Sequence, residues 1–100
     1  MKMTFDIPLE ELLKILGVSV RELQSRVRTR RLSDARSMIA ALLAPKYRMR
    51  QQDVADLFGT SQAAVSKMLV RHHQLMQFNT VYRNRYEQLY KLMSNRKNNL

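Results

Sequence analysis

The side chains best suited to chemistry in this chain are cationic and amide groups, gathered in two stretches. The first stretch, residues 26–32, reads Arg-Val-Arg-Thr-Arg-Arg-Leu, and Arg36 follows it. The second, residues 61–71, combines small and amide side chains with Lys67 and Arg71. Guanidinium groups pair well with phosphate, and amide groups pair with base edges. Both stretches therefore predict contact with a nucleic acid.

The sequence contains no recognisable catalytic or metal-binding arrangement. Without any Cys, a thiol nucleophile, a disulfide scaffold and a cysteine metal cluster are excluded. Two glycines are too few for a glycine-rich phosphate loop. His72 and His73 are adjacent, so on a helix their side chains diverge and do not share a metal ion. We expect no enzyme activity, no cofactor, no metal and no small-molecule substrate.

The charge balance points to a polyanionic partner. The 100 residues include 18 Lys and Arg against 8 Asp and Glu, a formal net charge of +10. Residues 21–36 and residues 81–100 hold most of this excess. No apolar run is long enough for a membrane span, and acidic residues interrupt the apolar N-terminal stretch, unlike a signal peptide. We expect a cytoplasmic, nucleoid-associated protein without a membrane partner.

Helical periodicity predicts the elements that position these side chains. We expect an all-α, compact bundle of about six helices that contains a helix-turn-helix. Ser19 and Glu22 predict a capping box that starts a short helix through Leu23. Ser33 is the predicted N-cap of the third helix, which Pro45 ends, so residues 26–32 become a basic loop. Residues 1–93 are predicted to form one domain, and residues 94–100 a polar, frayed tail.

The strongest local motif covers residues 51–70, QQDVADLFGTSQAAVSKMLV. Helices are predicted at about 51–58 and from Ser61 onward, and Gly59 supplies the positive φ of the turn between them. Ala55 is small where the helices cross. The side chains expected to face inward are Val54, Phe58, Val65 and Met68. A last helix is predicted with Tyr82, Tyr86, Leu89, Tyr90 and Met93 on one side.

The second helix of this motif begins with small and amide side chains, at Gln62, Ala63, Ala64 and Ser66. Such residues suit a helix that enters the major groove, while Lys67 and Arg71 lie where phosphates would be reached. The basic loop, placed beside it, is expected to contact the backbone or the minor groove. The candidate DNA-binding residues are Arg26, Arg28, Arg30, Arg36, Ser61, Gln62, Ala63, Ser66, Lys67 and Arg71.

Three stretches together resemble the C-terminal DNA-binding domain of the bacterial replication initiator DnaA, a member of the Trp repressor-like helix-turn-helix folds. They are ELQSRVRTRRLSDAR, ARSMIAALL and DVADLFGTSQAAVSKML. The resemblance covers about residues 9–93 and implies that Arg28 enters the minor groove and Arg36 contacts phosphate. It also implies base contacts from the first turn of the recognition helix, at Ser61, Gln62, Ala63 and Lys67.

The chain departs from this family at the turn. The family signature there is Arg-Asp-His-Thr-Thr, whereas this chain has Thr60-Ser61-Gln62-Ala63-Ala64. The resemblance therefore predicts the docking mode and not the DNA sequence, and it does not extend to the initiator's ATPase module. We expect a sequence-specific double-stranded DNA-binding protein, a monomer or weak dimer, in replication or transcription control. An RNA-binding module and a basic protein-interaction adaptor remain alternatives.

Overall fold

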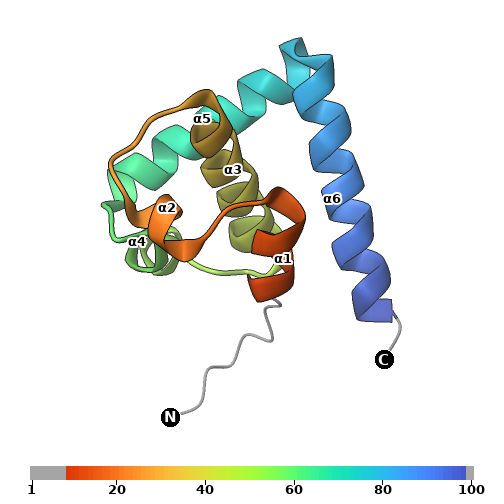
Figure 1. Cartoon of the computed structure of the whole chain (residues 1–100), viewed down its shortest axis with the longest axis horizontal. Helices are drawn as coiled ribbons and strands as arrows, with labels where there is room; N and C mark the ends of the chain where they lie inside the picture. The colour runs from red at the N-terminus through yellow and green to blue at the C-terminus, as the bar shows by residue number, and fades with distance from the viewer. Residues whose placement is uncertain (1–8, 99–100) are drawn as a thin grey trace.

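The structure, a computed structural model, describes residues 9–98, and within that range it contains helices and no strand (Figure 1). The predicted all-α bundle class is confirmed. The elements are α1 (Leu9–Leu16), α2 (Val20–Gln24), α3 (Arg30–Ala41), the π-helical turn η1 (Leu42–Lys46), α4 (Gln51–Phe58), α5 (Gln62–Phe78) and α6 (Thr80–Asn98).

Helix α3 forms the centre of the core, and α5 is its most extensive partner. Met38 and Ile39 of α3 are fully enclosed, together with Leu42 and Leu43 of η1. Full burial of one such side chain contributes roughly 1.5–3 kcal/mol. Around α3, helix α2 packs on α4, while α6 turns away from the end of α5, contacts it and reaches α1 (Figure 1). This packing fixes α5 relative to the segment that precedes α3.

Helix α3 begins earlier than the sequence predicted. Its N-cap is Thr29, whose side-chain oxygen accepts a hydrogen bond from the Leu32 backbone N–H at 3.3 Å. The Ser33 backbone N–H is already used, since it donates to the Thr29 carbonyl at 2.9 Å. Arg30 and Ser33 are therefore helical, and the predicted loop over residues 26–32 is too long. The segment between α2 and α3, residues 25–29, is called the basic loop below.

The end of α3 also differs from the prediction. The α-helical pattern stops at Ala41, and helical backbone continues through η1, with Pro45 inside it. Proline has no N–H to donate to the carbonyl four residues earlier, which here belongs to Ala41. The chain widens into a π turn at this point instead of ending the helix at Pro45.

Helix α6 buries Tyr82, Tyr86, Leu89 and Met93, as predicted, whereas Tyr90 is exposed. Its helical backbone continues to Asn98, past the predicted start of the tail at Ser94. No proline or glycine interrupts this stretch. Residues 99–100 of the predicted tail, and residues 1–8, lie outside the described range. Among the described residues, no helix is both long enough and apolar enough to span a membrane.

Candidate nucleic-acid interface

The turn between α4 and α5 has the geometry that its sequence predicted. Gly59 adopts a left-handed conformation with φ of 66°, and its N–H donates to the Asp56 carbonyl at 3.2 Å. The Thr60 N–H donates to the Ala55 carbonyl at 2.9 Å. Ser61 then caps α5, because its hydroxyl oxygen accepts from the Ala64 N–H at 3.2 Å. These backbone bonds fix where α5 begins.

Buried side chains hold the angle between α4 and α5. Val54, Ala55 and Val65 are fully buried, and Phe58 is nearly so. The side chain of Ala55 is a single methyl group, so α4 and α5 approach closely. Met68 is half-buried and packs against the edge of this cluster. The inward-facing set that the sequence predicted is therefore present, with Met68 at its rim.

The first two turns of α5 present an exposed surface of small and polar side chains. The exposed residues are Ser61, Gln62, Ala63, Ser66 and Lys67, whereas Ala64 is half-buried. The Ser66 hydroxyl donates to the Gln51 side-chain carbonyl oxygen at 2.9 Å, which ties this surface to α4. The amide of Gln62 is left exposed, with both a donor and an acceptor available to a partner.

The basic loop leaves the body of the protein beside the turn that opens α5. Gln24, the last residue of α2, donates its side-chain N–H to the Leu57 carbonyl at 2.9 Å. The Cγ atom of Gln24 also lies about 4.0 Å from where a Cβ would stand on Gly59. The end of α2, where the loop begins, therefore lies beside the turn that opens α5, although about 35 residues of sequence separate Gln24 from Gly59.

Three arginines of this region are fully available to a partner. Arg26 and Arg28 are exposed in the loop, and Arg30 is exposed in the first turn of α3. None of them makes a hydrogen bond or an ion pair with a side chain that the structure describes. Lys67 on α5 is also exposed. The structure thus brings four exposed cations to two adjoining segments.

Arg36, predicted to be a phosphate contact, is buried instead. Only 8% of this residue is exposed, and its guanidinium donates to four backbone carbonyls. Burial lowers the pKa of Arg36, and the charge of Arg28 lowers it further. Little of a guanidinium surrounded in this way is left to meet a phosphate. The signal was present in the sequence, because position 36 falls beside Ala35 and Ile39 on the apolar face of α3.

Arg71, also predicted to reach phosphate, points inward to α3. Its Nη2 lies 2.7 Å from Oδ1 of Asp34, and its Nη1 donates to the Ser37 hydroxyl at 3.4 Å. The contact with Asp34 is an ion pair without hydrogen-bond alignment. Arg71 is one-third exposed. Its charge is compensated within the fold, so it joins α5 to α3 and does not belong to the exposed cations.

Arg31 and Glu22 hold the start of α2, the helix before the basic loop. Arg31 pairs with Glu22 at 3.3 Å and donates to the Gly17 carbonyl. Glu22 completes the predicted capping box of α2, accepting from the Ser19 N–H at 3.0 Å. That backbone hydrogen bond lowers the pKa of Glu22, and the hydrogen bond from Arg31 lowers it further. The start of the short helix before the loop is therefore anchored.

The sequence did not single out the segment that precedes α4. Arg48 has a left-handed conformation with φ of 58° and is exposed. Arg50 pairs with Asp53 at 3.2 Å, and this hydrogen bond raises the pKa of Arg50 and lowers that of Asp53. The sequence gives no indication of this conformation, because arginine rarely adopts a positive φ.

The two adjacent histidines have different surroundings. The Nδ1 atom of His72 lies 2.7 Å from the Tyr82 hydroxyl, and the His72 ring packs edge-on against Tyr86 at 4.4 Å. Burial and, to a smaller extent, the neighbouring His73 lower the pKa of His72 to about 4, while burial raises the pKa of Tyr86 to about 12. Tyr82, likewise buried, also has a raised pKa. These contacts join α5 to α6.

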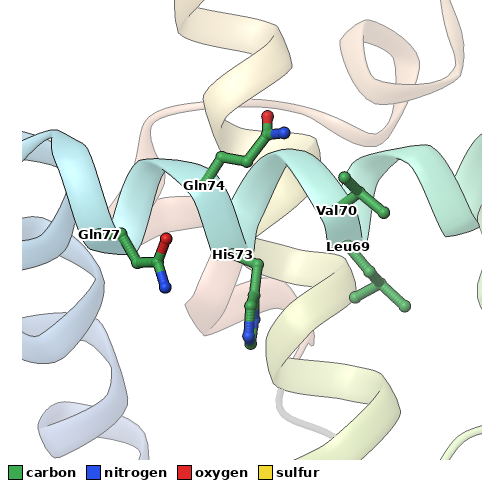
Figure 2. Close-up of a pocket in the computed structure, with 5 residues that line it drawn as sticks. All are labelled: Leu69, Val70, His73, Gln74 and Gln77. Carbon is green, nitrogen blue, oxygen red and sulfur yellow. The ribbon is translucent and has the colours of Figure 1, made fainter.

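His73 is exposed and lines a shallow hollow on the second half of α5 (Figure 2). Leu69 and Val70 supply its apolar part, and Gln74 and Gln77 supply its amide groups. Within the described residues, no group of three or more metal-binding side chains lies together. This hollow is separate from the first turn of α5, and no Lys or Arg is among its lining residues.

Comparison with known proteins found no matching family model, no matching curated protein and no matching solved structure.

Proposed function

We propose that this chain is a sequence-specific double-stranded DNA-binding protein. The start of α5 enters the major groove as the recognition helix of a helix-turn-helix formed with α4. The basic loop lies on the phosphates or in the adjacent minor groove. The proposal keeps the docking mode that the resemblance to the DnaA C-terminal domain implies, and it places the protein on nucleoid DNA in replication or transcription control.

The observation that carries this proposal is the adjacency of the basic loop to the start of α5. Gln24 bonds to Leu57 and lies against Gly59, so unpaired arginines adjoin an exposed, uncharged helix start. In DNA the phosphate backbone separates the major groove from the minor groove beside it. A helix start without charge suits base edges, and flanking guanidinium groups suit phosphates. The two surfaces match those two roles.

Because Arg36 and Arg71 have partners within the fold, we propose fewer DNA contacts than the sequence predicted. The cations expected to meet phosphate or the minor groove are Arg26, Arg28, Arg30 and Lys67. The side chains expected to meet base edges are Ser61, Gln62, Ala63 and Ser66. Arg36 and Arg71 act within the fold, through the carbonyls of residues 22–27 and through Asp34.

Selection from a random duplex pool tests this function. The protein is mixed with the pool at physiological salt, and the retained DNA is sequenced. We expect one enriched sequence with an A·T-rich tract beside it, and dyad symmetry in that sequence would indicate a dimer. A pool without enrichment contradicts sequence-specific binding. Displacement of the duplex by folded RNA at equal concentration would favour an RNA-binding module instead.

A further inference from the structure

Four backbone carbonyls around the basic loop converge on the guanidinium of Arg36. Its Nε donates to the Leu23 carbonyl at 3.0 Å, and its Nη1 donates to the Val27 carbonyl at 2.8 Å. Its Nη2 donates to the carbonyls of Glu22 at 3.1 Å and Ser25 at 3.0 Å. A guanidinium has five N–H donors, so four of the five are used within the protein.

Two of these carbonyls, those of Glu22 and Leu23, belong to the last turn of α2. Helix ends leave carbonyls without intrahelical partners, and many helices satisfy them with a glycine that reverses the chain. Helix α2 has no such glycine, and its C-cap is Ser25 in an extended conformation. Arg36 therefore bonds the Leu23 carbonyl at the end of α2 from a neighbouring helix, and it adds to the bonds that the Glu22 carbonyl already accepts from the N–H and hydroxyl of Ser25. The positive charge also suits the negative end of the helix dipole.

The other two bonds fix the loop itself. The carbonyls of Ser25 and Val27 both face Arg36, and Thr29 is held at the start of α3 by its cap. The carbonyl of the peptide unit between Val27 and Arg28 thus accepts a hydrogen bond from Arg36. On the C-terminal side of Arg28, the Thr29 cap holds the chain at the start of α3. The loop backbone around Arg28 is fixed before any partner arrives, while the Arg28 side chain remains exposed.

We propose that Arg36 is the positioning residue of the basic loop, holding its backbone so that Arg28 is presented in a preformed orientation to an A·T-rich minor groove. This inference rests on the proposed function, because DNA is the partner that Arg28 meets. A loop ordered in advance loses less conformational entropy on binding, which raises affinity without a new contact. Arg36 then strengthens DNA binding without touching DNA.

The free protein tests the structural half of this inference. Arg36→Lys keeps the positive charge but replaces the planar fork with a single flexible ammonium group. We expect the backbone amide order parameters of residues 25–29 to fall from about 0.85 towards about 0.6. The matched control is Arg31→Lys, since Arg31 is also on α3 but bonds outside the loop, and it should leave the loop ordered. Unchanged loop order in Arg36→Lys overturns the inference.

Duplex binding tests the functional half, with sites flanked by A·T or by G·C pairs. Arg36→Lys should weaken binding to the A·T-flanked site roughly tenfold and abolish the flank preference. In an Arg28→Ala background the same change should have little further effect, because Arg36 acts through Arg28. The inference is overturned if Arg36→Lys binds as the wild type does and Arg36→Met lowers the salt slope by about 1. That pair of results would make Arg36 a phosphate contact.

Two outcomes keep this inference separate from the proposed function. Wild-type protein that binds no duplex contradicts the function, while the order parameters of the free loop still decide the role of Arg36. If the Arg36 variants do not fold, the wild-type protein provides the measurement. The Arg36 Nε–H should exchange with water much more slowly than that of Arg85, an exposed arginine of α6. Equal exchange rates overturn the inference.

Discussion

The arginines of this chain divide into two kinds according to what surrounds each guanidinium. Arg36 is enclosed by carbonyls and Arg71 is paired with Asp34, so both hold helices in place. Arg26 and Arg28 have neither kind of neighbour and are exposed. A charge that already has internal partners gains little from a phosphate, because the existing bonds must be broken first. The exposed arginines are therefore the ones available to DNA.

At the surface proposed to contact bases, the sharpest prediction concerns Gln62. An amide pairs with adenine through two hydrogen bonds in the major groove, so Gln62→Ala should cost about 1–3 kcal/mol on the selected site. Binding to random duplex should change little. The control is Gln74→Ala, which removes an exposed amide from the second half of the same helix. Titrations of both variants decide the role, and an equal loss on both DNAs would show that Gln62 does not read sequence.

The candidate residues could be predicted from the sequence only in part. Gln62 and Lys67 follow from the turn before them, since the position of a helix start fixes which residues are exposed on its first turns. The internal partners of Arg36 and Arg71 were not predicted. Their partners are carbonyls of residues 22–27 and the carboxylate of Asp34, which lie 9–37 positions away. Sequence spacing does not reveal such distant partners.

At the scale of elements, local chemistry predicted most of the boundaries. The αL glycine at 59, the cap at Ser61 and the capping box at Ser19 and Glu22 were all confirmed. The start of α3 was predicted wrongly because Thr29 and Ser33 are both capable caps, four residues apart. Packing of Leu32 into the core favours the earlier one. Tertiary burial, rather than cap preference, decides that boundary.

The turn between α4 and α5 should depend on the backbone conformation of Gly59. Its surroundings are open, since Gln24 Cγ at about 4.0 Å is an ordinary contact for an added Cβ. Strain from the positive φ should therefore dominate, and Gly59→Val should cost on the order of 1–3 kcal/mol. Thermal unfolding measures the loss. Gly59→Asn, which tolerates this conformation, should lose less, and equal stability of both variants with the wild type would contradict the account of the turn.

The contact between α5 and α6 predicts how stability changes with pH. Because the folded-state pKa of His72 is about 4, against an ordinary value of 6.5, the unfolded chain binds more protons between these values. The free energy of unfolding should be highest above pH 6.5 and should fall as the pH decreases towards 4. Glu22 and Asp53 have lowered pKa values, so their own contributions are lost only at more acidic pH.

Denaturation by urea at pH 7.0 and at about pH 5.3 measures this effect. Two side chains face His72, those of Tyr82 and Tyr86. The charged groups near this contact are Arg71 and Asp34, which lie close to Tyr82, and His73 follows His72 in the sequence. His72→Gln should flatten the dependence on pH between the two values. His73→Gln, which removes an exposed imidazole, should leave it in place. A wild-type protein equally stable at both pH values contradicts the burial of a neutral His72.

At the scale of the whole molecule, three acidic side chains are paired with arginines of the same fold. Asp34 pairs with Arg71, Glu22 with Arg31 and Asp53 with Arg50. Each pair is neutral in itself, so the net charge of +10 comes from the other charged residues. Such a field attracts a polyanion and makes its binding dependent on salt. A protein-interaction adaptor would lack that dependence.

The salt dependence of duplex binding tests the central claim most directly. Four exposed cations, at Arg26, Arg28, Arg30 and Lys67, predict that log affinity falls against log salt with a slope of about −3 to −4. Arg28→Ala should reduce its magnitude by about 1, and Arg85→Ala on α6 should leave it unchanged. A slope near zero for the wild-type protein on its selected site would contradict DNA binding through this interface.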